Sequence, residues 1–279
     1  MKQFAFLVIA SLAFTSCYHA EDSVLDTSSR DVNFRIQVEG LTQEALTRAS
    51  TPALDTPTKL LILDRCGTTV TNYVKTSFND LSLPLKLGVH DLYFVATPKD
   101  WASFSSDDLT VTWPNDGTMK AVWAYHYQLD VVSETTFEDL VLPLAVADVR
   151  LGTLDKLPAQ VQMATVEAPD VSTVLDLTTM TAGGGDGYTR TINVAANAGK
   201  NAFAVNIYTF VPESSTVGDI SLAFYSDTDL TSEVASRDIS GVQVKAGYVS
   251  NYTGYFFTDG LSIPVTYTTE WLGVDNYSY

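Results

Sequence analysis

A strict alternation of apolar and polar residues at residues 31–39 is the clearest secondary-structure signal near the start of the chain. Val32, Phe34, Ile36 and Val38 alternate there with charged or amide side chains. A period of two predicts a β-strand that buries one face and leaves the other in water. We therefore expect the first strand of a sheet here, with these four side chains in its core.

Short apolar or alternating runs continue along the rest of the chain. We interpret as strands residues 60–63, 69–75, 81–87, 92–96, 119–131, 137–142, 161–166, 171–177, 189–195, 202–210, 220–225 and 242–257. The runs are rich in β-branched and aromatic residues, and no amphipathic window is long enough for a substantial helix, so we expect less than about a tenth of the residues in helix. One or two helical turns at residues 41–48 and a short helix around Trp101 are the expected exceptions.

The length of the chain and one interrupted apolar run predict two domains. The 279 residues, 46% of them hydrophobic, exceed the usual single-domain size of about 100–150 residues. Pro143 interrupts the apolar run at residues 137–151, so a strand should end near residue 142 and a new domain begin near residue 145. We expect an all-β protein made of two antiparallel β-sandwiches in tandem. The expected divisions are residues 1–17, 18–48, 49–145 and 146–279.

The first seventeen residues have the form of an export signal. Lys2 supplies a positive start, residues 4–14 form an apolar run interrupted only by Ser11, and Thr15 and Ser16 precede Cys17. A run of eleven residues is too short to span a bilayer, which needs about 20 apolar residues. The ending resembles a bacterial lipoprotein box, although Phe14 stands where leucine is commoner. We expect a lipid on Cys17 that ties the precursor to a membrane; the alternative is a plain secreted protein with a chance cysteine.

Charge and chemistry exclude several classes of function. The net charge of −17 and the pI near 4.3 argue against binding to nucleic acid, which needs a basic surface. Cys17 and Cys66 are the only cysteines, so no disulfide framework is expected. His19, His90 and His126 lack partners recognisable in the sequence, and no pair of carboxylates is marked by its spacing. We expect no metal site, no cofactor and no catalytic residue.

The connection after the first predicted strand contains a bond that a protease could reach. Pro52 and Pro57 prevent a helix at residues 41–48 from continuing. The Arg48–Ala49 bond should therefore lie in or beside an exposed loop. A cut after Arg48 would separate residues 31–39 from the rest of the chain and leave their sheet open.

The end of the chain repeats the opening pattern. Ile263, Val265, Tyr267 and Trp271 lie on one face of an alternating run that continues into residues 272–279. Two interpretations remain open. This segment is either an edge strand of the second sandwich or a strand offered to another subunit.

The order of these features resembles the fimbrillins of Bacteroidales, the type V pilus subunits. The stretches that carry the resemblance are LLILDRCGTTVTNYV, LKLGVHDLYFVAT, LVLPLAVADVRLG, LPAQVQMATV, VKAGYVSNYTGYFF and IPVTYTTEW, which follow the lipoprotein box and the Thr-Arg-Ala loop. The resemblance implies two transthyretin-like β-sandwiches behind a lipidated leader. It also implies that an Arg-specific extracellular protease removes the leader with its first strand, and that the vacated groove accepts a strand from the next subunit.

Carried over to this sequence, the resemblance assigns a role to four segments. Cys17 would carry the lipid, Arg48–Ala49 would be the cleaved bond, residues 31–39 would be the removed strand, and residues 263–279 would contain the donor. The chain would be an outer-membrane lipoprotein precursor that becomes a subunit of an adhesive cell-surface fimbrium. Its partners would be other copies of itself or related pilus subunits.

Other roles stay open at this stage. The anchor subunits of the same family keep their leader and their lipid, and a tip adhesin is a further alternative. A lipid-anchored module could instead bind glycans through Trp101, Trp113 and Trp123. Exposed tryptophans would favour glycan binding, whereas buried ones would belong to the core.

Overall fold

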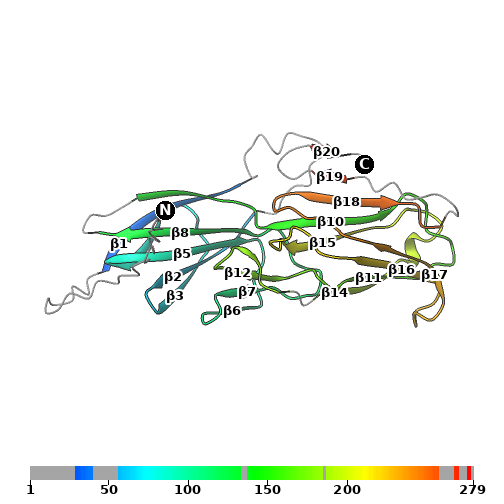
Figure 1. Cartoon of the computed structure of the whole chain (residues 1–279), viewed down its shortest axis with the longest axis horizontal. Coiled ribbons are helices and arrows are strands. Elements are labelled where there is room, and N and C mark those ends of the chain that lie inside the picture. Colours follow the sequence, from blue (N-terminus) through cyan, green and yellow to red (C-terminus); the bar gives the residue numbers. More distant parts are fainter. Residues whose placement is uncertain are drawn as a thin grey trace, which may run out of the picture.

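The computed structural model describes residues 29–39, 56–132, 137–184 and 187–257, and the backbone of two short strands at residues 267–269 and 275–277. The molecule is elongated, with one group of sheets at each end (Figure 1). Helical structure in this part of the chain amounts to a single 3-10 turn, η2 (Ala195–Asn197), and no helix there is long and apolar enough to cross a membrane. The prediction of an all-β protein is confirmed.

Two sheets face each other in the N-terminal half. The β1 sheet has the order β4-β1-β9, and the β2 sheet has the order β3-β2-β5-β8. The strands are β1 (Ser29–Val38), β2 (Lys59–Cys66), β3 (Thr69–Lys75), β4 (Leu81–Lys86), β5 (Gly88–Thr97), β8 (Trp123–Val131) and β9 (Phe137–Leu142). Phe34 of the β1 sheet contacts Phe94 of the β2 sheet, with ring centroids 5.6 Å apart. The first hydrophobic core lies between these two sheets.

The C-terminal half repeats this arrangement with two further sheets, of order β15-β10-β18 and β14-β11-β16-β17. Their strands are β10 (Val146–Thr153), β11 (Met163–Ala168), β14 (Tyr188–Asn193), β15 (Ala204–Phe210), β16 (Ile220–Tyr225), β17 (Glu233–Ile239) and β18 (Val249–Gly254). Phe203 and Phe224 meet edge to face in the second core, at 5.4 Å between ring centroids. Val146 belongs to the first core and Ala147 to the second. We keep a domain division near residue 145 as a proposal.

Strands from both halves build one more sheet between them, which we call the joining sheet. Its order is β13-β12-β7-β6, from β6 (Ser103–Ser105), β7 (Thr110–Thr112), β12 (Val174–Asp176) and β13 (Thr181–Ala182). The backbone N–H of Trp113 donates to the carbonyl of Thr173 at 3.1 Å, and that of Leu177 donates to Leu109 at 2.9 Å. The two halves are therefore connected by a hydrogen-bonded sheet as well as by the covalent chain.

The structure corrects three details of the sequence analysis. Residues around Trp101 form no helix, because the N–H of Ala102 donates to Thr112 at 2.6 Å and this draws the segment into the joining sheet. The sandwiches are not wholly antiparallel, since β1–β9 and β10–β18 are parallel pairs. Strand β17 was not predicted, because its side chains are exposed or only partly buried and do not alternate.

Near the end of the chain, β19 (Tyr267–Thr269) and β20 (Asp275–Tyr277) pair antiparallel with each other. In Figure 1, β19 lies beside β18. The predicted helical turns at residues 41–48 lie outside the described residues.

Candidate functional site

Strand β1 occupies the middle of its sheet and is bonded on both sides. It pairs antiparallel with β4, where Phe34 lies opposite Leu81. It pairs parallel with β9, where Ile36 lies opposite Leu140. The N–H of Ile36 also donates to the carbonyl of Phe78 at 2.8 Å. The first strand of the described chain therefore completes a sheet whose other two strands come from much later in the sequence.

The inner face of β1 is part of the first core. Val32, Phe34 and Ile36 are buried, as the alternation predicts, whereas Val38 is only partly buried. A fully buried side chain of this size contributes about 1.5–3 kcal/mol relative to an exposed one. Without β1, the apolar surfaces that these side chains cover would face water.

The outer face of β1 carries a cation that contacts β9. The Nη1 atom of Arg35 lies 3.4 Å from Oδ1 of Asp139, and the guanidinium carbon lies 5.1 Å from the centre of the Phe137 ring. These contacts are partly exposed, so each contributes at most about 1 kcal/mol. Neither partner was predicted from the sequence, because the parallel register of β1 and β9 is what brings them beside Arg35.

Strand β9, one of the two neighbours of β1 in the sheet, is held in place by contacts that do not involve β1. The hydroxyl of Tyr127 on β8 donates to Oε2 of Glu138 on β9 at 2.7 Å. Burial, together with the hydrogen bond and the charge of Glu138, raises the pKa of Tyr127 to about 12. The phenol therefore keeps its proton at neutral pH and goes on donating to Glu138.

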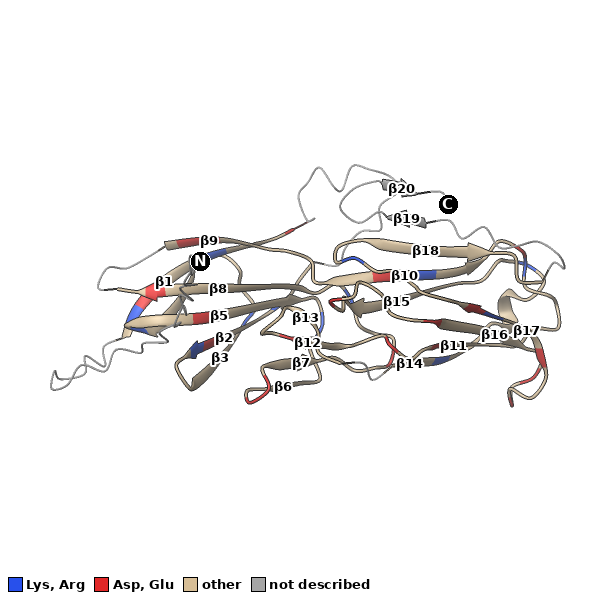
Figure 2. Ribbon diagram, in the orientation of Figure 1, with Lys and Arg blue, Asp and Glu red and all other residues tan. Residues whose placement is uncertain are grey.

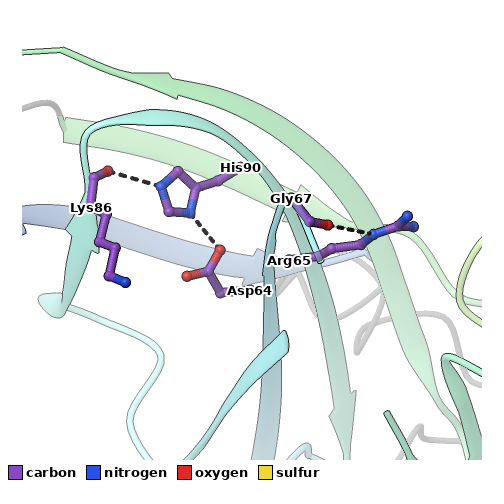
Figure 3. A network of polar contacts seen from close by, with 5 residues as sticks. All are labelled: Asp64, Arg65, Gly67, Lys86 and His90. Atoms are coloured by element: carbon purple, nitrogen blue, oxygen red, sulfur yellow. Dashed lines mark hydrogen bonds and ion pairs between the residues drawn. The ribbon is translucent and has the colours of Figure 1, made fainter. Parts of the chain in front are cut away.

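A buried histidine contacts the end of strand β4, the other neighbour of β1 (Figure 3). Nδ1 of His90 lies 2.5 Å from Oδ1 of Asp64, and Nε2 lies 2.8 Å from the carbonyl of Lys86, the last residue of β4. Because both ring nitrogens face acceptors, the ring satisfies both contacts only as an imidazolium. Burial alone lowers the pKa of His90, but the hydrogen bond and charge of Asp64, with smaller effects of Lys86 and Asp130, raise it above 6.5.

Most of the predicted processing and donor residues lie outside the described residues. These are Cys17, Arg48, Ala49, Ile263, Val265 and Trp271. Tyr267 begins β19, of which only the backbone is described. The roles of these residues therefore stay predictions.

The tryptophans named for glycan binding belong to the core. Trp113 and Trp123 are buried, and Trp101 is partly buried against the first core. The indole N–H of Trp123 donates to the carbonyl of Glu39 at 2.9 Å, just beyond β1. A glycan platform built from these three residues therefore has no support.

The two described histidines take part in protein contacts. His90 lies between Asp64 and Lys86, and His126 lies 3.1 Å from Asp91 and stacks on Tyr93. Among the described residues, no group of three or more histidine, cysteine or acidic side chains is placed to hold a metal ion.

Comparison with known proteins relates this fold to solved structures of fimbrial and candidate adhesion proteins from Porphyromonas and Bacteroides species. No protein-family model matches the chain, and a search of curated proteins finds no match. Solved structures do match. The fimbrial anchor protein Mfa2 from Porphyromonas gingivalis aligns with a TM-score of 0.54 and 12% identity, covering 90% of this chain and 100% of that one.

Two further solved structures share the fold. A candidate adhesin from Bacteroides ovatus has a TM-score of 0.55 and 10% identity, over 83% of this chain and 90% of that one. A candidate polysaccharide-binding protein from Bacteroides thetaiotaomicron has a TM-score of 0.52 and 11% identity, over 89% and 98%. At these identities the comparison establishes a shared fold. The same fold occurs in a fimbrial anchor protein and in candidate adhesins.

Proposed function

We propose that this chain is a subunit of a cell-surface fimbria, opened by a cut after Arg48 and joined to a neighbouring subunit by exchange of β1. It is exported as an outer-membrane lipoprotein through Cys17. An incoming strand from the neighbour takes the place of β1 in the site between β4 and β9. Similarity to the fold of a fimbrial anchor protein and of candidate adhesins supports this role.

The observation that carries the proposal is the position of β1 in the chain and in its sheet. β1 lies between β4 and β9, yet it precedes every other described strand. Residues 39–58 connect it to β2, and Arg48 lies within this connection. A single cut there leaves β1 held only by hydrogen bonds and packing.

The energetics favour replacement of β1 once it is free to leave. Loss of the strand exposes the apolar partners of Val32, Phe34 and Ile36 and the backbone groups of two ladders, each bond of which contributes about 0.5–1.5 kcal/mol net. Ordering an incoming segment costs about 1–2 kcal/mol per residue, so a strand of matching alternation is required. Ile263, Val265, Tyr267 and Trp271 give the C-terminal segment such an alternation.

Exchange between subunits builds a filament because the contact is head to tail. The accepting and donating surfaces differ, and a contact of this type does not close on itself. The precursor is complete with its own β1 and stays a monomer. Cleavage therefore acts as the switch for assembly.

Treatment of the purified precursor with an Arg-specific protease should yield a ladder of oligomers on an unboiled gel. Arg48→Ala and a chain truncated before Ile263 should both remain monomeric. Arg65→Ala is the matched control, since Arg65 is an exposed arginine at the end of β2 and its loss should leave the ladder intact. Cleavage at Arg48 that leaves monomers favours a tip subunit. Resistance to cleavage contradicts the switch and favours a subunit that remains a lipid-bound anchor.

The precursor should also incorporate labelled palmitate and partition into detergent. Cys17→Ala should lose both properties, because the thioether that holds the lipid cannot form. Cys66→Ala removes the other cysteine of the chain and should label like the wild type. Equal labelling of the Cys17 variant and the wild type would rule out the lipid assignment.

A further inference from the structure

We call the place between β4 and β9 that β1 fills the β1 site, and its solvent-exposed edge along β9 the rim. The rim carries one acidic and one aromatic side chain, and β1 itself contacts both. Asp139 and Phe137 project on the exposed face of β9, and Arg35 of β1 contacts both. Figure 2 shows acidic positions on β9 and both acidic and basic positions on β1. When β1 leaves, Asp139 loses this cation and the Phe137 ring loses the charge beside it.

The geometry specifies what a matching strand must carry. Phe34 and Ile36 point into the core, and Arg35 lies between them on the outer face. Register places Arg35 directly opposite Asp139. A strand that reproduces the native contacts therefore needs apolar residues at alternate positions and a lysine or arginine at the position of Arg35.

The C-terminal segment of this chain cannot supply that cation. Residues 258–279 contain no lysine and no arginine, and their charged residues are Asp259, Glu270 and Asp275. In any register and in either direction, this segment places a neutral or acidic residue beside Asp139. Its alternation suits the inner face of the site, but its charge does not suit the rim.

We propose that the β1 site selects a strand from an unlike subunit, one that carries a lysine or arginine on its outer face opposite Asp139. This inference rests on the proposed strand exchange and names the chemistry of the partner. Asp139 and Phe137 determine specificity, and the inner face supplies the sequence-tolerant part of the affinity. The chain then prefers an unlike subunit when both strands compete, and its own C-terminal segment fills the site more weakly, as in the ladder expected of the purified precursor.

The test uses the precursor cut at Arg48, with the protease inhibited before peptides are added. Each peptide competes with a fluorescent peptide of residues 29–39 for the cut protein. Substitution of Arg35 by Gln in the peptide should weaken binding by about five- to tenfold, the combined effect expected of one exposed ion pair and one cation–π contact. A peptide with Arg35→Gln and Gln37→Arg has the same composition and charge as the native one but places the cation opposite Val141, away from Phe137, and it should be weakened similarly.

A change in the receptor separates rim selection from general electrostatic attraction. Asp139→Asn in the cut protein removes the ion pair and leaves the Phe137 ring, so the preference for the native over the Arg35→Gln peptide should narrow to about two- to threefold. A peptide of residues 258–279 should bind the unchanged receptor no more tightly than the Arg35→Gln peptide does. Equal binding of the native, rearranged and C-terminal peptides overturns the selection while leaving strand exchange intact. Failure of the cut protein to take up any peptide overturns strand exchange and the selection together.

Discussion

Phe34→Ala should lower the free energy of unfolding of the intact precursor by about 3–5 kcal/mol, the usual cost of removing a buried phenylalanine ring. The ring is fully buried and contacts Phe94 across the first core, at 5.6 Å between centroids. Both sheets of the N-terminal half line the cavity that alanine would leave. The loss therefore includes packing on each side as well as the transfer of the ring itself.

Chemical denaturation of the full chain measures this change. Val74→Ala on β3 is the matched control, because Val74 is 57% exposed and its substitution should alter stability by no more than about 0.5 kcal/mol. Similar midpoints for both variants would show that β1 is not an integral part of the first core. In that case its removal could not leave a receptive site.

Asp64→Asn should lower the free energy of unfolding by about 3–5 kcal/mol at pH 6, because it removes one partner of a buried ion pair. His90 is 1% exposed and would remain near the carbonyl of Lys86 without its counter-charge. Asp130 is a further acidic group near the ring, and it compensates only weakly for the lost carboxylate. The end of β4 should loosen as a result, since His90 connects it to the β2 sheet.

The effect of Asp64→Asn should depend on pH in a defined direction. The folded-state pKa of His90 is raised above 6.5, so the stability contributed by the charged ring is fully present below pH 6.5 and is lost as the pH rises through the folded-state pKa. The difference in the free energy of unfolding between wild type and variant should therefore narrow as the pH rises above 6.5.

Asp91→Asn provides the control for the His90 pair. It changes the pair of Asp91 with His126, which is partly exposed, and should cost at most about 1 kcal/mol. A constant effect of Asp64→Asn from pH 5 to pH 9 would contradict a charged His90.

The sequence predicts strands well where one face is buried and the other is wet. Val32, Phe34 and Ile36 alternate in the sequence and are buried in the structure, because the period of the pattern equals the period of the strand. In β17 the same rule fails, since its residues are exposed or only partly buried. An edge strand with no fully buried face leaves no alternation in its sequence.

Pairing between distant segments is the part that the sequence does not reveal. Arg35 meets Asp139 through a register that depends on the whole first sandwich. His90 has no visible partner in the sequence, but pairing of β2 with β5 brings Asp64 to its Nδ1 atom. Likewise, Thr112 of β7 lies opposite Val174 of β12 in the joining sheet. These contacts follow from topology, which local pattern does not determine.

The joining sheet also bears on how the subunit responds to tension. If the chain is a fimbrial subunit as proposed, tension applied to the ends of the filament must pass from one half of each subunit to the other. Here it passes through β7 and β12 together with β10, whose first residues are shared between the two cores. The two halves cannot separate freely, because separating them requires the hydrogen bonds of the joining sheet to break. Resistance to stretching under force is thus built into the middle of the molecule, and single-molecule pulling should show no extension at low force from separation of the two halves.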